Sequence, residues 1–348
     1  MRKLFTPVTV IIFLATSVVS ASAFTGVPVP SLLTGDFDTS AEVPSDGDGS
    51  DEGGHDHSSH DHGPADAPGH AATPAALDTP AADHLPDNDR ARGLVFDGLR
   101  PGAQAGPCGG GSYEIPLDNG TVICTHGPDT APPGFDMRAE RPTADLEATA
   151  AAAGDGSDTA AEGAVVPCIG DGTSGNRVQA VYAVSSDRTD RYSEIAPLIA
   201  GWAGAVDQVF ADSAAQVGAE RHVRFVTDGN CDLAVERVVL SPTGDDSISN
   251  TINEMRALGY DRDDRKYLIW SDASVYCGIA QIWPDDSPGQ DNLSNTRAGY
   301  ARTDQNCWGR THSTEAHELV HALGGVQRSA PHASAAWHCT DDSDRMCY

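Results

Sequence analysis

The chain changes in composition near residue 165, and this change limits which part of it can fold around a core. Residues 24–165 contain 25 acidic side chains against 5 basic ones, so they carry most of the formal net charge of −29. Small and polar residues dominate the segment, and aromatic residues are few. Because low hydrophobicity with high net charge does not offset the entropy of ordering a backbone, we expect residues 24–165 to be mostly disordered.

Two features interrupt this acidic segment. Residues 54–62 interleave histidines with carboxylates, a pattern typical of a weak, flexible site for divalent metals or of a solvated polar tract. Residues 90–138 contain Cys108 and Cys124, which one disulfide could join into a small module. The role of residues 24–165 stays open between a propeptide and a spacer.

The first residues predict export. Arg2 and Lys3 precede a short apolar run over residues 8–19, and Ala21-Ser22-Ala23 offers a small-residue cleavage site. We therefore expect residues 1–23 to be a signal peptide and the mature chain to be secreted and extracellular. No later stretch approaches 18 apolar residues, so the sequence predicts no spanning helix.

The eight cysteines fit an oxidising compartment, where disulfides persist. Their even number leaves no obligatory free thiol, but spacing alone does not choose among the connectivities. The acidic surface would repel nucleic acid and anionic membranes. We expect protein or peptide substrates as partners, neither nucleic acid nor membrane, and a monomer.

Residues 166–348 have the composition of a globular domain, and roughly 180 residues are ample for one core. Apolar periodicity predicts an α/β (α+β) fold in which strands and helices alternate before a last helix. The expected strands are 177–184, 222–226, 266–270, 278–283 and 298–301, and the expected helices are 194–211, 247–258 and a segment from Thr311 or Ser313 to Gly324-Gly325. The continuous apolar run in 266–270 indicates a central strand.

The last predicted helix carries His317-Glu318-Leu319-Val320-His321. Histidines four residues apart project from one helical face about one turn apart, which suits two ligands of one tetrahedral zinc ion. Glu318 lies beside the first ligand, where its carboxylate can act as general base toward a zinc-bound water that attacks a peptide carbonyl. This spacing predicts zinc as cofactor and Glu318 as the catalytic residue.

The motif and the residues that follow it resemble the secreted bacterial metzincin-type zinc metalloproteases. In that resemblance Gly324 bends the chain sharply toward a third ligand, and Met346 in Asp344-Arg345-Met346-Cys347-Tyr348 forms the Met-turn below the zinc. The resemblance implies a twisted, mostly parallel five-stranded sheet with the active-site helix below a cleft. It covers about half of the chain, from Arg177 onward, and implies a catalytic domain over residues 166–348.

The sequence departs from the metzincin pattern at the third ligand. The position three residues after the glycine is Gln327, whose neutral amide oxygen is a poor zinc ligand. We favour His338, because the adjacent Cys339 could anchor its loop, and we keep His332 as the second choice. The chain also ends two residues after Met346, where relatives continue, so a C-terminally truncated domain is expected.

Two further features are weaker. The residues from Tyr276 to Trp283 either form an edge strand that pairs with an extended peptide substrate or are an ordinary strand. Asp285-Asp286 and Asp341-Asp342 offer oxygen ligands for Ca²⁺, or are paired surface acids without an ion.

The sequence thus predicts a secreted zinc-dependent endopeptidase. The alternative is a secreted protein, related to metzincins but inactive, that binds or scavenges zinc without catalysis. Its motivation is the histidine tract, the missing ligand at Gln327 and the early C-terminus.

Overall fold

The computed structural model describes residues 84–152, 165–310, 314–334, 337–340 and 345–347. The predicted signal peptide, residues 1–23, and the histidine tract, residues 54–62, lie outside the described residues. The same holds for the expected caps Thr311 and Ser313 and for the second acidic pair, Asp341-Asp342.

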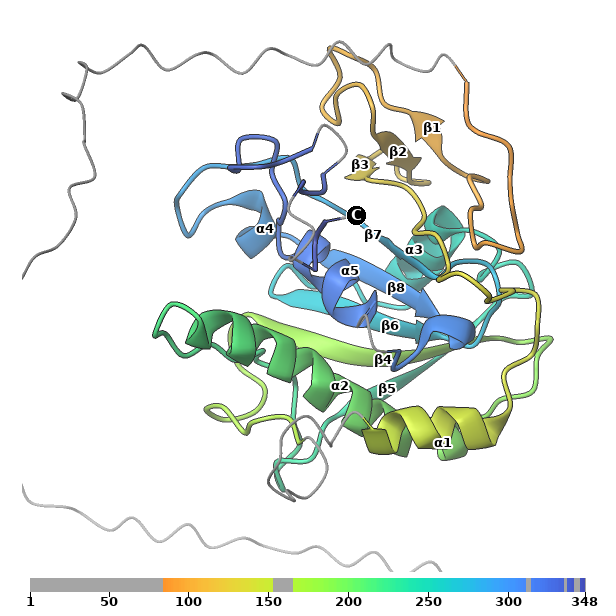
Figure 1. The fold of residues 1–348 in the computed structure, drawn as a ribbon, viewed down its shortest axis with the longest axis vertical. Coiled ribbons are helices and arrows are strands. Elements are labelled where there is room, and N and C mark those ends of the chain that lie inside the picture. The colour runs from red at the N-terminus through yellow and green to blue at the C-terminus, as the bar shows by residue number, and fades with distance from the viewer. Residues whose placement is uncertain (1–83, 153–164, 311–313, 335–336, 341–344, 348) are drawn as a thin grey trace, which may run out of the picture. The chain divides into compact units, whose positions relative to one another are not determined.

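A five-stranded sheet forms the centre of the described fold (Figure 1). Its strands in chain order are β4 (Arg177–Ser185), β5 (Val235–Leu240), β6 (Arg265–Ser271), β7 (Gly278–Ala280) and β8 (Gly299–Asp304). Their order across the sheet is β5-β4-β6-β8-β7, with β7 antiparallel to β8 and every other pair parallel. The prediction of a mostly parallel five-stranded sheet in a mixed α/β fold is confirmed.

The central strands are apolar because both faces of the sheet are covered. In β4, Val178 and Tyr182 face one hydrophobic cluster, whereas Val181 and Ala183 face the other. β6 lies between β4 and β8, as its continuous apolar run predicts, and all seven of its residues are buried.

Helices cover the two faces of the sheet unequally. On one face lie α2 (Tyr192–Ala215) and α5 (Thr314–Ala322), and α1 (Thr143–Ala152) packs against α2. The other face is covered by α3 (Ile248–Ala257). Two shorter helical segments are α4 (Leu293–Thr296) and the 3₁₀ turn η1 (Gln305–Cys307).

Residues 84–152 correct the expectation of disorder over residues 24–165. They contain α1 and a small antiparallel sheet of β1 (Arg100–Pro101), β2 (Tyr113–Pro116) and β3 (Val122–Thr125). Their apolar side chains join the cluster that packs under the main sheet: Val95, Phe96, Leu99, Ile115, Leu117 and Ile123. A composition averaged over the whole segment hides these few apolar residues, which are buried against a core supplied from elsewhere in the chain.

One expected strand is also wrong. Residues 222–226 form only an isolated bridge, between Phe225 and Val178. The edge strand that pairs with β4, on the side away from β6, is instead β5. The exposed Glu236 and Arg237 interrupt the apolar pattern of β5, which is why periodicity did not identify it.

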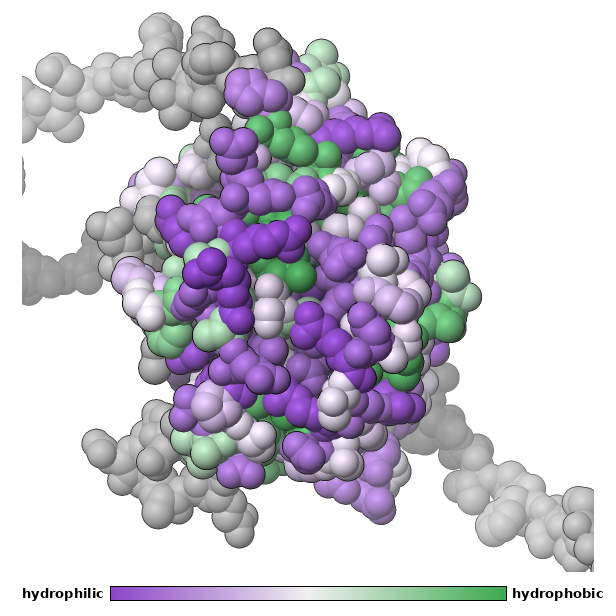
Figure 2. Space-filling model, turned by 90° about the vertical axis from the view of Figure 1, so that its right-hand side faces the viewer, coloured by the Kyte–Doolittle hydropathy of each residue, from purple (hydrophilic) through white to green (hydrophobic). Residues whose placement is uncertain are grey.

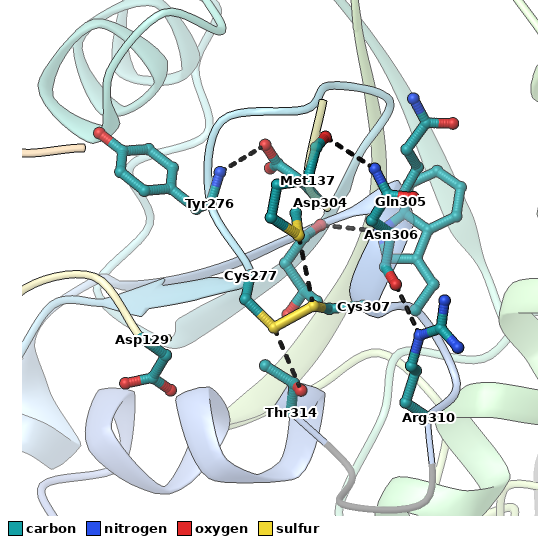
Figure 3. Close-up of a disulfide and its surroundings, with 12 residues drawn as sticks. Asp129, Met137, Tyr276, Cys277, Asp304, Gln305, Asn306, Cys307, Arg310 and Thr314 are labelled. Carbon is teal, nitrogen blue, oxygen red and sulfur yellow. Dashed lines mark hydrogen bonds between the residues drawn. A yellow bond between two sulfur atoms is a disulfide. The ribbon is translucent and has the colours of Figure 1, made fainter. Parts of the chain in front are cut away.

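All eight cysteines are paired, as Cys108–Cys124, Cys168–Cys231, Cys277–Cys307 and Cys339–Cys347. The first pair is the disulfide that the sequence suggested within residues 90–138. Figure 3 shows the Cys277–Cys307 bond, which joins the residue before β7 to η1 beside Met137. Asn306 donates to the Met137 carbonyl, so this disulfide region also holds residues from the N-terminal half of the fold.

A buried ion pair supports the loop that leads into β7. Arg302 and Asp304 are both fully buried and lie 2.8 Å apart, and the Asp304 carboxylate accepts hydrogen bonds from the backbone N–H groups of Val275 and Tyr276. Removing one partner of a buried pair leaves an uncompensated charge.

We therefore expect Asp304→Ala to lower the free energy of unfolding by about 3–5 kcal/mol, measured by denaturant titration. Asp190→Ala is the control, because Asp190 pairs with Arg237 at a partly exposed site and its loss should cost about 1 kcal/mol or less. Equal losses in the two variants would contradict the structural role of the buried pair.

Among the described residues, no helix is long and apolar enough to cross a membrane. The face of the molecule in Figure 2 is mostly hydrophilic, with apolar side chains in small separate groups.

Candidate metal centre

Three histidine side chains converge beside α5. His317 and His321 lie on the helix, with 3.1 Å between their Nε2 atoms. His338 comes from the loop beyond the helix, and its Nε2 atom is 3.2 Å from that of His317. Zinc–nitrogen bonds of about 2.0–2.1 Å place the ligands of a tetrahedral site about 3.3–3.4 Å apart. The geometry of the three imidazoles therefore fits one small tetrahedral metal ion.

Backbone carbonyls orient the two helical imidazoles. His317 Nδ1 lies 2.7 Å from the carbonyl oxygen of Arg345, and His321 Nδ1 lies 2.7 Å from that of Gly325. A carbonyl only accepts hydrogen bonds, so each Nδ1 carries the proton and each Nε2 keeps its lone pair. This is the tautomer that a metal-binding histidine needs when Nε2 is the ligand atom.

The bend after α5 depends on Gly324. Its φ of 102° lies in the region that favours glycine, and a Cβ atom there would lie 2.6 Å from Ser294 Oγ. The turn brings the next carbonyl, that of Gly325, onto His321. The sharp bend expected at Gly324 is present in the structure.

The structure separates the three candidates for a third ligand. His338 joins His317 and His321 in one group of possible ligand atoms. The side-chain amide of Gln327 instead donates to the carbonyls of Trp283 and Gly324, and it lines a cavity of about 430 Å³ together with Asp285 and Asp286. His332 is exposed, and no group of possible metal ligands in the described residues includes it.

Met346 is buried, and its neighbours support the histidines. The Met346 carbonyl accepts a hydrogen bond from Cys339 N, and the Arg345 carbonyl orients His317. Cys339 and Cys347 are joined by a disulfide, so the loop with His338 is tied to the segment with Met346. The neighbouring cysteine thus anchors the loop, which was the reason for favouring His338.

Glu318 is fully buried beside the imidazoles. Its Oε2 atom lies 3.3 Å from His126 Nε2, and its Oε1 atom has no hydrogen-bond partner among the described residues. A Cβ atom at Gly278 would lie only 2.0 Å from Oε1, so the glycine at the start of β7 leaves room for the carboxylate.

His126 and Asp129 complete the cluster, and sequence reasoning did not assign them to it. His126 belongs to the same set as His317, His321 and His338, and the ligand atoms of these four histidines all lie within 4.8 Å of one another. Asp129 lies 3.4 Å from His126 and 3.5 Å from His317. His126 is 192 residues from Glu318 in the chain, and local spacing carries no signal for such a contact.

The pKa values of the two buried carboxyls, Glu318 and Asp129, are shifted in opposite directions. Burial raises the pKa of Glu318 well above its ordinary value, and the adjacent Asp129 carboxylate raises it further. Burial also acts to raise the pKa of Asp129, but His317 and His126 outweigh it and bring the value to about 2. Of the two carboxyls, Glu318 therefore has the greater affinity for a proton, which suits it to accept one.

Burial disfavours the charged form of three imidazoles in the cluster. Burial lowers the pKa of His126 to about 3 and that of His338 to about 4, and it lowers the pKa of His321 well below the ordinary value. Neutral imidazoles are the form that binds a metal ion. The described residues thus contain a buried His/Asp/Glu group that could hold a metal ion.

Comparison with known proteins assigns no family to the chain. No family model matches it, and no curated protein matches it. Among solved structures, it is similar to metalloproteinase-II from Bacteroides fragilis, with 10% identity over 68% of this chain and 69% of that chain. The TM-score is 0.22, too low to carry an inference about fold or activity.

Proposed function

We propose that this protein is a secreted zinc-dependent endopeptidase. The single observation that carries the proposal is the convergence of the Nε2 atoms of His317, His321 and His338 next to the buried carboxylate of Glu318. Three imidazole nitrogens are a ligand set that suits zinc, and catalytic zinc sites commonly have three protein ligands.

A zinc ion bound there would polarise a peptide carbonyl and make a coordinated water acidic. Glu318 would accept the proton of the attacking water on Oε1, the atom left without a partner, and pass it to the leaving amine. The backbone bonds to Arg345 and Gly325 would keep the imidazoles in place during this transfer. The raised pKa of Glu318 favours its holding a proton between the two steps.

Peptide hydrolysis is expected to depend on the metal. Any casein cleavage by the purified zinc-loaded chain should stop after treatment with 1,10-phenanthroline and return when zinc is restored. Cleavage that continues in protein shown to be free of metal would contradict the proposal.

The alternative is a non-catalytic zinc-binding protein. It was motivated by the poor ligand at Gln327. His338, however, places a ring nitrogen beside His317, whereas the Gln327 amide is hydrogen-bonded to the Trp283 carbonyl. A chain that binds one zinc ion tightly and never hydrolyses peptides would favour this alternative.

A further inference from the structure

A segment of the N-terminal half lies along the outer edge of β7. The Cys124 carbonyl accepts a hydrogen bond from Ile282 N, and Asp129 N donates to the Gly278 carbonyl. Cys124 and Ile282 form an antiparallel bridge, so residues 124–129 run opposite to β7. β7 pairs with β8 on its other side. The segment thus uses main-chain bonds in the way an extended peptide adds to a sheet edge.

The same segment delivers His126 to the metal group. His126 lies with all three candidate ligands in one set, whereas Asp129 belongs to a set with His126, His317 and Glu318. Four imidazoles around one ion would close its tetrahedron. Closed tetrahedra are typical of structural zinc sites, and catalytic sites keep one position open for water or substrate.

The segment also lies against the catalytic groups, because His126 Nε2 is 3.3 Å from Glu318 Oε2 and the His126 ring centroid is 4.2 Å from that of His321. Glu318 and His321 have no exposed surface, and the His126 side chain is 2% exposed. A polypeptide substrate must bring its carbonyl to the metal and to Glu318. An extended substrate that pairs with β7 would have to displace residues 124–129 from that edge.

Several contacts hold His126 in this position. The disulfide to Cys108 fixes Cys124, two residues before it. Gly127, with a φ of 103°, turns the chain directly after it, and a Cβ atom there would lie 2.7 Å from the Tyr113 ring. His126 Nδ1 is 3.4 Å from Asp129. The position of His126 is thus built into the module.

We propose that His126 is a fourth protein ligand of the metal and that residues 124–129 occupy the peptide-binding edge, so that the chain in this conformation is latent. The inference rests on the proposed function of the site. It identifies this stretch as a substrate-like inhibitor within the chain, and it implies that activity requires the stretch to leave β7.

Metal coordination tests this inference without reference to catalysis. X-ray absorption of the zinc-loaded full chain should fit four imidazoles, whereas three imidazoles and a non-histidine ligand would overturn it. In the cobalt-loaded full chain, acetohydroxamate should leave the visible spectrum unchanged. In His126→Ala and His126→Asn it should bind and change the spectrum. Equal acetohydroxamate binding by the native chain would also overturn the proposal.

Two control variants show whether a change in metal coordination is specific to His126. His222→Ala removes a histidine that also pairs with an aspartate, Asp207, but lies outside the metal group, and it should behave as the native chain. Asp129→Asn should keep four imidazoles in the zinc-loaded chain. Loss of an oxygen ligand in Asp129→Asn would assign the fourth position to Asp129 and contradict the role of His126.

Activity provides a second measurement. Cleavage of a short fluorogenic peptide by zinc-loaded His126→Ala and His126→Asn should rise about tenfold or more over the native chain, because a larger fraction of molecules is open. Equal rates in native and variant chains would contradict latency. If coordination changes as expected but neither variant nor the native chain cleaves any peptide, the endopeptidase proposal fails while His126 remains a ligand.

Discussion

Glu318→Gln is expected to reduce peptide cleavage by about 10²–10⁴-fold, the usual contribution of a positioned general acid–base group. Glutamine keeps the size of the side chain but accepts no proton from water at neutral pH. Zinc binding should be unchanged, because the three candidate ligands are His317, His321 and His338. The rates are best compared on casein or a fluorogenic peptide, both in the native chain and in the His126→Asn background.

The matched control is Glu194→Gln, which makes the same chemical change on the exposed surface of α2. This variant should retain full activity and full zinc content. Full activity in Glu318→Gln would rule out the proposed role of this carboxylate. Loss of activity together with loss of zinc would show instead that the substitution disturbs the metal site.

His338→Ala is expected to weaken zinc binding by more than about 100-fold. Loss of a residue that only hydrogen-bonds to a metal ligand already lowers metal affinity by about 10–100-fold, and loss of a direct ligand should lower it further. The reason is geometric, since the 3.2 Å separation between His338 and His317 places both nitrogens around one ion. Competition against a chelator of known affinity measures the change.

His332→Ala and Gln327→Ala are the controls, since both residues were candidates for the third ligand on sequence grounds. His332 is exposed, and the side-chain amide of Gln327 donates hydrogen bonds to two backbone carbonyls. Zinc affinity should stay within about threefold of the native value in both, the range of ordinary surface substitutions. An affinity loss in His332→Ala that matches the loss in His338→Ala would contradict the assignment.

The sequence predicts the local part of the site well. Two histidines and a glutamate within five residues depend only on helical geometry, and the glycine bend depends only on backbone sterics. Both are found in α5 and at Gly324. The parallel strands β4 and β6 were also predictable, β4 from its alternating pattern and β6 from a continuous apolar run of the kind that burial on both faces favours.

The rest of the site comes from contacts that no local pattern encodes. His126 reaches Glu318 across 192 residues, and the segment that carries it was expected to be disordered. Its few apolar residues, such as Phe96 and Ile123, are buried only because α3 and the sheet offer a surface for them. The choice among His338, His332 and Gln327 likewise depends on how the loop after Gly324 folds back.

The most direct test of the central proposal is a zinc titration of the metal-free chain with peptide cleavage measured at each point. It should be carried out on the native chain and on His126→Asn. Cleavage is expected to rise in proportion to bound zinc and to stop rising at one ion per chain, with Glu318→Gln binding the same amount and remaining inactive. Peptide cleavage before any zinc is added, or none from either zinc-saturated chain, would contradict the proposal.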